Sequence, residues 1–526
     1  MFKTIKNDIP ASIVVFFVAL PLCLGIALAS GAPLFSGLIA GIIGGIVVGA
    51  ISGSKIGVSG PAAGLAAIVL SAISTLGGYE NFLVAVVLGG LIQLLFGVLK
   101  AGVIGYYFPS SVIKGMLTGI GIIIILKQIP NFFGYDEESA WDLEFFELDG
   151  GTTFSELFEI VNNIHPGAAI IGVISLAILI FWEKVLAKEG KLFQLIQGPF
   201  AAVVLGIVFF VVTKENEWLS ISQKHLVTVP IPENASEFFG QFSFPNFAVI
   251  TNLDVWVAAF TIALVASLET LLCVEATDKL DPNKNVTPTN RELLAQGTGN
   301  VLSGLIGGLP ITQVIVRSSA NIQSGGRSKL STIIHGFLLL ISVILIPRLL
   351  NMIPLSVLAA VLLIVGYKLA KPSLFKKMYQ LGWKQSIPFT VTVVGIIFTD
   401  LLVGIGLGLM VGIVVILLKS YQNSHFLHIE DKSNGKHKIK MTLAEEVTFF
   451  NKGAILKELD SLPRDTYLDL DVRNTRYLDN DIIEILDDFA FKAKERNIDI
   501  KLISERGIIE NPESFIEFFK LRPKSA

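Results

Sequence analysis

Gly57-Val58-Ser59-Gly60-Pro61 and Gly307-Gly308-Leu309-Pro310 are the two stretches that decide the fold of this 526-residue chain. Each interrupts a long apolar run with glycine and proline, the residues that end or break helices. Each also opens a short apolar segment, 60–75 and 312–324, and these are the third and tenth of fourteen such segments. Matching interruptions in the two halves of a membrane protein predict an inverted repeat, with a ligand site between broken helices.

The composition of the chain is that of an integral membrane protein. Hydrophobic residues make up 52% of the chain and charged residues only 16%, whereas about a quarter of a soluble domain is charged. Lys55 is the only charged residue between Ile9 and Tyr79. Because a membrane-spanning helix needs roughly 20 apolar residues, such stretches hold several spans each. The net charge of −3 implies no nucleic-acid partner.

Apolar runs separated by glycine, proline or charge divide residues 1–424 into the fourteen segments. We predict an all-α polytopic membrane domain in which they form a seven-plus-seven inverted repeat. Their approximate limits are 12–30, 34–51, 60–75, 81–99, 108–127, 165–183, 198–213, 254–277, 290–306, 312–324, 329–347, 353–369, 385–398 and 401–418.

The positive charges alternate along this set of segments. With the N-terminus inside, connections that follow even-numbered segments should be rich in lysine and arginine. Those connections hold Lys55, Lys100, Lys184, Lys188, Lys191, Lys279, Lys284, Arg291, Arg327, Lys329, Lys368, Lys371, Lys376, Lys377, Lys384 and Lys419. The other connections hold only Lys127, Lys214, Lys224 and Arg348, and the loop 131–163 has neither lysine nor arginine. We therefore expect a multi-pass protein of the cytoplasmic membrane with both termini in the cytoplasm.

The composition changes after Ser424, where charged residues return. We assign residues 425–437 to a polar linker and residues 438–526 to a small cytoplasmic α/β domain. No catalytic motif stands out in it. Its strand-like runs are 447–450, 467–472 and 498–502, and its helical patterns are 452–459 and 479–491.

The two glycine- and proline-rich interruptions predict an anion site. Pro61 and Pro310 can each occupy the first position of a helix, where the missing N–H costs nothing. Two half-helices would then direct free N–H groups and positive dipole ends inward. The alternative is that each proline only kinks an ordinary span, and the same alternative holds for Pro21 in the first segment.

Two charged side chains, Arg317 and Glu269, fall inside the predicted spans. A guanidinium within a membrane is costly and is usually paired or functional. Arg317 is roughly 15 Å along a helix from Arg327, which argues against its simply reaching the cytoplasmic edge. Glu269 has Cys273 one turn later on the same face. Its carboxylate could bind a cation, carry a proton or pair with Arg317.

These motifs resemble those of the SulP family, the bacterial relatives of solute carrier family 26, over nearly the whole chain. The resemblance implies a fourteen-segment inverted repeat, a core domain that moves against a gate domain, a homodimer and a C-terminal STAS domain. It rests on Asp8-Ile9-Pro10-Ala11, Leu20-Pro21, Val58-Ser59-Gly60-Pro61, Gln296-Gly297-Thr298-Gly299-Asn300, and Gly307-Gly308-Leu309-Pro310 followed by Arg317.

Within the family, Ala19-Leu20-Pro21-Leu22, Ala29-Ser30-Gly31-Ala32 and Val58-Ser59-Gly60-Pro61 are similar to the cyanobacterial sodium-driven bicarbonate transporters. This resemblance implies that the anion contacts Leu22, Ile26, Ser59, Gly60, Pro61, Ala62, Val314, Ile315, Val316 and Arg317.

The same resemblance places a coupling ion at Glu269 and Cys273, which fall where those transporters hold sodium. We add Gln313 to this candidate site. Ile315 stands where the relatives have a threonine, so one hard oxygen ligand for sodium is missing. Na⁺ coupling, H⁺ coupling and uncoupled transport therefore stay open, and no other cofactor or metal is expected.

The expected function is secondary transport of a small inorganic anion by alternating access, with bicarbonate as the first candidate and sulfate as its main rival. A narrow pocket with one arginine, lined by Leu22, Ile26, Ala62 and Val316, suits a monovalent planar anion. Nucleobase and dicarboxylate carriers would need more polar side chains.

A channel or an anion-gated sensor could use the same site. The sequence has no metal cluster, nucleophile–base pair or phosphate loop that would indicate an enzyme. Signalling STAS domains are phosphorylated on a serine where this chain has Asn480, so we expect no phosphorylation switch there.

Overall fold

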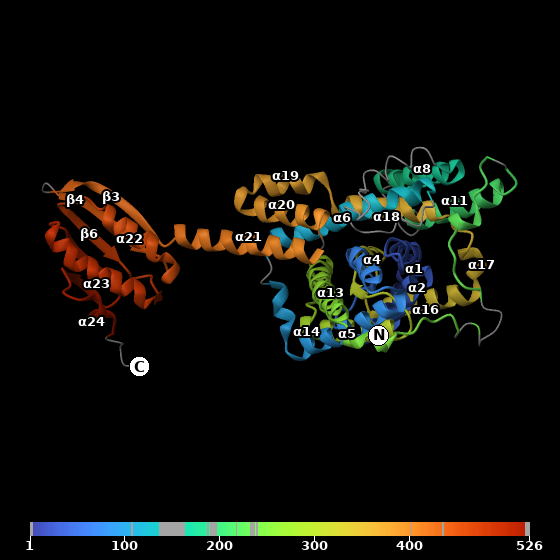
Figure 1. Ribbon diagram of the computed structural model, residues 1–526, viewed down its shortest axis with the longest axis horizontal. Coiled ribbons are helices and arrows are strands. Elements are labelled where there is room, and N and C mark those ends of the chain that lie inside the picture. Colours follow the sequence, from blue (N-terminus) through green and yellow to red (C-terminus); the bar gives the residue numbers. More distant parts are fainter. Residues whose placement is uncertain are drawn as a thin grey trace. The chain divides into compact units, whose positions relative to one another are not determined.

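Each of the fourteen predicted apolar segments coincides with a helix in the computed structural model (Figure 1). The structure describes residues 4–106, 109–135, 164–186, 197–216, 218–231, 240–399, 401–433 and 436–520, together with Glu189 and Glu237. Most of the acidic loop 131–163, as well as Lys188 and Lys191, lies outside these residues. The chain divides into two units, Met1–Leu409 and Met410–Ala526, which are described separately.

One group of helices in the first unit is formed by segments from both halves of the chain, and we call it the core group (Figure 1). Helices α5 and α14 approach closely because glycines face each other: a Cβ on Gly297 would lie 2.8 Å from the Gly90 carbonyl oxygen. The core group comprises α1 (Ile5–Ala29), α2 (Leu34–Ile43), the π-helical turn η2 (Gly44–Val48), α3 (Gly49–Ile51), the 3-10 turn η3 (Ala63–Leu65), α4 (Ala66–Thr75), α5 (Tyr79–Val98), α13 (Leu253–Leu280), α14 (Thr289–Leu305), α15 (Ile315–Gln323) and α16 (Lys329–Leu345).

A second group of helices, the gate group, packs mainly within itself (Figure 1). Helices α6 and α18 also meet through glycines, with a Cβ on Gly121 lying 2.7 Å from the Gly366 carbonyl oxygen. The gate group comprises α6 (Ser110–Phe133), α8 (Pro166–Phe181) with the turn η6 (Trp182–Leu186), α11 (Gly198–Thr213), α18 (Leu355–Leu369), α19 (Pro372–Gln380) and α20 (Trp383–Phe398). Further elements are η4 (Ala101–Tyr106), η7 (Gln223–His225), η8 (Phe247–Thr251), α17 (Pro347–Leu350) and α21 (Leu401–Gln422).

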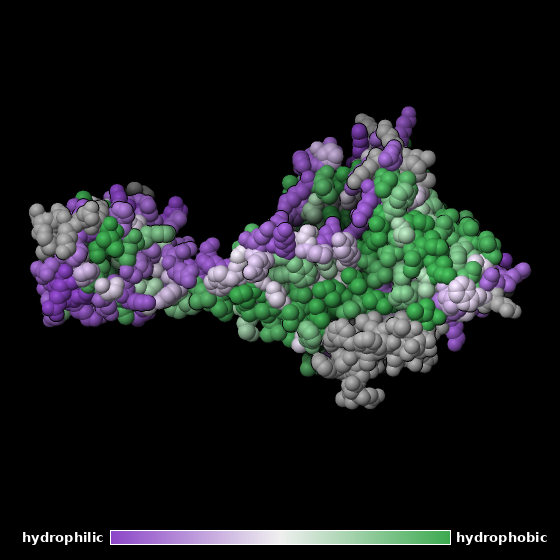
Figure 2. All heavy atoms as spheres, turned by 90° about the horizontal axis from the view of Figure 1, so that it is seen from above, coloured by the Kyte–Doolittle hydropathy of each residue, from purple (hydrophilic) through white to green (hydrophobic). Residues whose placement is uncertain are grey.

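The outward-facing side chains of these helices are apolar. Val98, Val212 and Leu345 are 68%, 76% and 72% exposed, and Figure 2 shows hydrophobic residues over much of the visible face of the helical unit. Within the described residues, eight helices are at least 18 residues long and apolar enough to cross a membrane, and four more are shorter. Exposed apolar helices of this length identify a membrane-spanning unit. That all fourteen segments cross the bilayer stays a prediction.

A two-stranded antiparallel ribbon lies inside the core group. Strand β1 (Ser59–Pro61) pairs with β2 (Ile311–Gln313), with Gly60 opposite Thr312. The prediction that both prolines begin helices was wrong. Pro61 ends β1 and Pro310 precedes β2, because a residue without an N–H is tolerated where the ladder stops. Helices α4 and α15 each start five residues after these prolines, at Ala66 and Ile315.

The second unit ends in a five-stranded sheet of order β3-β4-β6-β8-β9. The β4–β6 and β6–β8 pairs are parallel, and the two edge pairs are antiparallel. Its strands are β3 (His425–Ser433), β4 (Lys436–Leu443), β6 (Thr466–Asp471), β8 (Asp499–Ser504) and β9 (Gly507–Glu510). It also has the short pair β5 (Glu446–Val447) and β7 (Tyr477–Leu478), the turn η9 (Phe449–Asn451), and helices α22 (Lys452–Ser461), α23 (Asn480–Glu495) and α24 (Phe515–Lys520).

The residues assigned from sequence to a polar linker, 425–437, are β3 and the first residues of β4. Polar composition misled here because β3 is an edge strand. Its Phe426 and Ile429 side chains are 66% and 73% exposed, so it lacks the apolar alternation of a half-buried strand.

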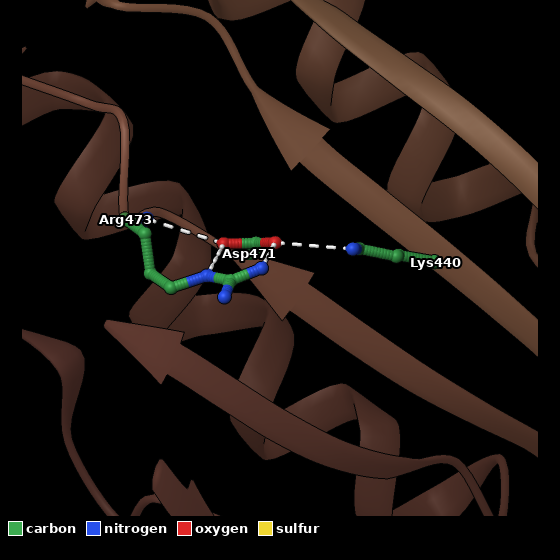
Figure 3. A network of polar contacts seen from close by, with 3 residues as sticks. All are labelled: Lys440, Asp471 and Arg473. Carbon is green, nitrogen blue, oxygen red and sulfur yellow. Dashed lines mark hydrogen bonds and ion pairs between the residues drawn. The ribbon is translucent and has the colours of Figure 1, made fainter. Parts of the chain in front are cut away.

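Asp471 at the end of β6 is expected to make the stability of this sheet depend on pH. It accepts hydrogen bonds from Arg473 Nε at 2.9 Å and Nη2 at 2.6 Å, and it pairs with Lys440 Nζ at 3.1 Å (Figure 3). The Arg473 fork, helped by Lys440, holds the pKa of the Asp471 carboxyl well below its usual value. The contribution is therefore present above the unfolded-state pKa of about 3.9 and lost as the pH falls through the lower folded-state pKa.

We expect Asp471→Asn to destabilise the sheet by about 1 kcal/mol at neutral pH and to weaken this acid dependence. Hydrogen exchange of the β6 amides in the full chain measures both effects. Asp469→Asn on the same strand is the control, because Asp469 forms no ion pair among the described residues. Equal exchange in the two variants would contradict the assignment.

Candidate functional site

Arg317 is the charged side chain around which the candidate site is built. It lies in the first turn of α15 and is 1% exposed. Its Nη1 and Nη2 atoms have no hydrogen-bond partner in the structure, and no ion pair joins it to Glu269 or to another described carboxylate. The alternative in which Glu269 simply neutralises Arg317 is therefore wrong. The core group instead holds a buried cation that has no carboxylate partner among the described residues and lies beside the Cys23 thiol.

The β1 strand forms one wall beside this guanidinium. A Cβ built on Gly60 would lie 2.2 Å from Arg317 Nη1, so only glycine lets the side chain lie against the strand. Pro61 and Ala62 follow and are also buried. The Ser59 side chain is directed elsewhere, because its Oγ accepts a hydrogen bond of 2.8 Å from Gln296 Nε2 on α14.

Helix α1 packs against α15 on another side of the site. Leu22 and Ile26 are buried at 6% and 4% exposure, and between them Cys23 places its thiol next to Arg317. No sequence pattern indicates this neighbour, because the contact between α1 and α15 depends on tertiary packing.

The first turn of α15 supplies backbone donors. The first intrahelical bond of its N-terminus runs from the Ser318 N–H to the Val314 carbonyl at 3.1 Å. The N–H groups of Ile315, Val316 and Arg317 therefore have no acceptor within the helix. Val316 is 42% exposed, so this end of the helix is open. A helix N-terminus with free donors beside a cation is chemically suited to an anion.

Glu269 on α13 lies against Gly64, near the start of the third predicted segment. Its carboxylate accepts a hydrogen bond from the Gly64 N–H, and a Cβ on Gly64 would lie 2.7 Å from Glu269 Oε2. Cys273, one turn later, places its thiol beside the Ile315 N–H. These residues lie together as the sequence predicted, whereas the Gln313 side chain donates to Thr277 Oγ1 at 3.1 Å.

His335 on α16 is a further neighbour of Arg317, and no sequence pattern singles it out. It is fully buried, and neither ring nitrogen has a hydrogen-bond partner among the described residues. Among the described residues, no group of three or more His, Cys, Asp or Glu side chains could hold a metal ion.

Gly60→Ala is expected to weaken anion binding while leaving the fold intact. The added methyl group must displace Arg317 Nη1, the mobile end of a long side chain, and not a backbone atom. Losing one hydrogen bond to a charged group corresponds to about a tenfold loss of affinity. Titration of the purified protein with bicarbonate and sulfate measures this effect. Gly406→Ala on α21, where an added Cβ has no atom within 4 Å, should bind as the wild type does.

Comparison with known proteins identifies the family of this chain. Residues 5–393 match the Sulfate permease family. The provisionally named sulfate transporter YvdB of Bacillus subtilis is 26% identical over 523 residues, covering 97% of this chain and 93% of that protein. The bicarbonate transporter BicA of Picosynechococcus is 27% identical over 458 residues, covering 85% and 76%.

The fold is shared with a solved eukaryotic structure. The murine solute carrier 26 family member A9 anion transporter, in its inward-facing state, superposes with a TM-score of 0.75 at 14% identity, covering 95% of this chain and 85% of that one. The match to the family model over residues 5–393 shows that the chain belongs to the sulfate permease (SulP) family, and it is a membrane transporter and not an enzyme.

Proposed function

We propose that this protein is a secondary transporter that carries a small inorganic anion across the cytoplasmic membrane, with bicarbonate as the leading substrate. The observation that carries the proposal is the buried Arg317 guanidinium with both terminal nitrogens unpaired. An uncompensated charge in a membrane-embedded core costs several kcal/mol, and a bound anion removes that cost. The N–H groups of Val316 and Arg317, which have no acceptor within α15, add donors of the same kind.

The division into core and gate groups supports alternating access by an elevator-like movement. Gly60, Glu269 and Arg317 all lie on core-group elements, joined by the β1–β2 ribbon. The whole site can therefore travel as one body past the gate group. The proposal includes fourteen spans as a seven-plus-seven repeat, cytoplasmic termini, a homodimer and a STAS-type C-terminal domain.

The walls of the proposed anion site around Arg317 and Gly60 are formed by seven apolar residues. These are Leu22, Ile26, Pro61, Ala62, Val314, Ile315 and Val316. Four of these seven side chains are buried, and all are aliphatic or proline, which leaves Arg317 and backbone donors to hold the charge.

Glu269 is proposed to couple transport to Na⁺ or H⁺. Its Oε2 atom is buried without a partner, and its carboxylate lies at the start of the broken third segment. Cys273 and Ile315 offer a thiol and an alkyl group where a sodium site would use oxygen ligands, which favours H⁺.

Uptake into liposomes tests the function. Purified protein is reconstituted, and the entry of labelled bicarbonate and sulfate is followed under separate Na⁺ and H⁺ gradients. Saturable accumulation of bicarbonate against its gradient supports the proposal and identifies the coupling ion. Sulfate accumulation without bicarbonate transport would assign the protein to sulfate, the activity in the name of its Bacillus subtilis relative. Flux that never exceeds equilibrium would indicate a channel.

A further inference from the structure

The chain between α3 and β1 is held along its length by side chains from the second half of the protein. Residues 52–58, between the end of α3 and the start of β1, have no regular secondary structure, so these contacts set the path that leads into β1. The second-half partners are Lys329 (carbonyls of Ala50 and Ser52), Arg291 (carbonyl of Ile51), Glu292 (Ser52 and Gly53), Asn321 (carbonyl of Ile56), Thr332 (carbonyl of Gly57) and Ser318 (N–H of Val58).

Glu292 is the carboxylate of this set, and it is fully buried. Its Oε2 accepts hydrogen bonds from Ser52 Oγ at 2.6 Å and from the Gly53 N–H at 3.2 Å. Its Oε1 accepts one from Gln296 Nε2 at 3.0 Å. Because a carboxylate only accepts, the Gln296 amide must present its nitrogen to Glu292. The reverse orientation would place two acceptor oxygens against each other.

Gln296 uses its second N–H to bind β1. The donor is again Nε2, at 2.8 Å from Ser59 Oγ. Successive side chains of a strand point to opposite faces, so Gln296 holds β1 from the side opposite to Gly60, which lies against Arg317. The strand is thus fixed between a buried amide behind it and the guanidinium in front of it.

We propose that Glu292 and Gln296 are positioning residues that hold β1 in place, so that Gly60 keeps Arg317 aligned for the anion. The inference rests on the proposed anion site. It changes the role of Ser59, which becomes the point of attachment of β1 and not a ligand of the anion.

An exchange of the two side chains provides a sharp test. Glu292→Gln places an amide N–H against a donor, and Gln296→Glu places two carboxylates together, so each change alone breaks the chain of hydrogen bonds. In the double variant, the amide at position 292 can accept from Ser52 and Gly53 and donate to the carboxylate at position 296. That carboxylate can accept the Ser59 hydroxyl proton. Every hydrogen bond is restored, and Ser59 now donates to position 296 where it accepted before.

We expect each single variant to bind bicarbonate or sulfate about tenfold more weakly than wild type, and the double variant to recover to within about threefold. Binding is measured on the purified full chain, with the thermal midpoint recorded for each variant. Gln323→Leu, which changes an exposed amide on α15, is the matched control and should bind normally. A double variant that folds but binds as weakly as the single variants would show that the anion needs the Ser59 proton, and would overturn the proposal.

A second cycle covers the case in which the exchanged variant does not fold. Gln296→Leu and Ser59→Ala remove the same hydrogen bond, so the combined variant should bind no more than about twofold more weakly than the weaker single variant. Multiplicative losses would overturn the proposal. If wild type itself binds neither anion, the proposed function is wrong. That result differs from multiplicative losses of affinity in variants of a protein that does bind.

Discussion

Replacing Arg317 by alanine is expected to lower the affinity for the transported anion by about 100-fold or more. The anion loses a buried, charged donor, and hydrogen bonds to charged groups contribute about 1.5–3 kcal/mol each. Arg317→Lys should recover only part of the affinity, because lysine keeps the charge and loses the planar fork. Binding of bicarbonate and sulfate to purified protein measures the effect.

The same position should respond in the opposite direction when stability is measured. Without an anion, the Arg317 guanidinium is buried with both Nη atoms unpaired. Replacing it by methionine, which has a similar shape, is therefore expected to stabilise the fold by about 1–4 kcal/mol in anion-free buffer. A raised thermal midpoint together with lost binding would identify a functional charge. A lowered midpoint would show that Arg317 serves the structure.

Arg327→Ala is the control for both measurements. Arg327 is exposed, and the contact it makes with Asp8 uses its backbone N–H, which alanine keeps. Normal affinity is expected. A loss as large as that of Arg317→Ala would indicate a general dependence on positive charge and would contradict the assignment of the site.

Glu269→Gln is expected to abolish the dependence of uptake on the driving cation. Glutamine keeps the shape of the side chain, and its amide oxygen can still accept the Gly64 N–H, so the fold should survive. It can neither release a proton nor carry the negative charge that attracts a cation. The ratio of uptake with and without an imposed Na⁺ or H⁺ gradient should fall to about one, measured in liposomes.

Glu275→Gln on the same helix is the matched control. Glu275 is largely exposed and pairs with Lys279 at 2.5 Å on the surface. Uptake in this variant should keep its ion dependence, because surface pairs of this kind contribute little. If Glu269→Gln also keeps it, Glu269 is structural and the coupling group lies elsewhere.

Hydrophobic pattern was sufficient to place the fourteen apolar segments of the membrane unit on helices, whereas α17 and the more polar α19 fall outside those segments. Most of the apolar runs are long, and the glycine and proline stretches at 57–61 and 307–310 mark real breaks at β1 and β2. The same reasoning selected Arg317 and Glu269, because an ionisable residue in an apolar run is rare enough to stand out. The apolar runs and the rare ionisable residues within them were therefore enough to predict these helices and to select Arg317 and Glu269.

Contacts between distant parts of the chain could not be predicted in this way. The ribbon pairs Ser59 with Gln313, and no local propensity shows that two short polar stretches form strands with each other. The proximity of Cys23 and His335 to Arg317 depends on how α1 and α16 pack. The edge strand β3 was missed because its hydrogen bonds to β4, and not its composition, define it.

The β1–β2 ribbon also has a consequence for biosynthesis. Strand β1 is made early, and its partner β2 follows roughly 250 residues later, which at 5–20 residues per second takes about 10–50 s. During that interval the nascent first half has a broken third segment whose backbone groups lack their native acceptors and donors. The unpaired β1 strand is then open to membrane quality-control proteases. A substitution that delays the insertion of α14 or β2 would lengthen its exposure to proteolysis.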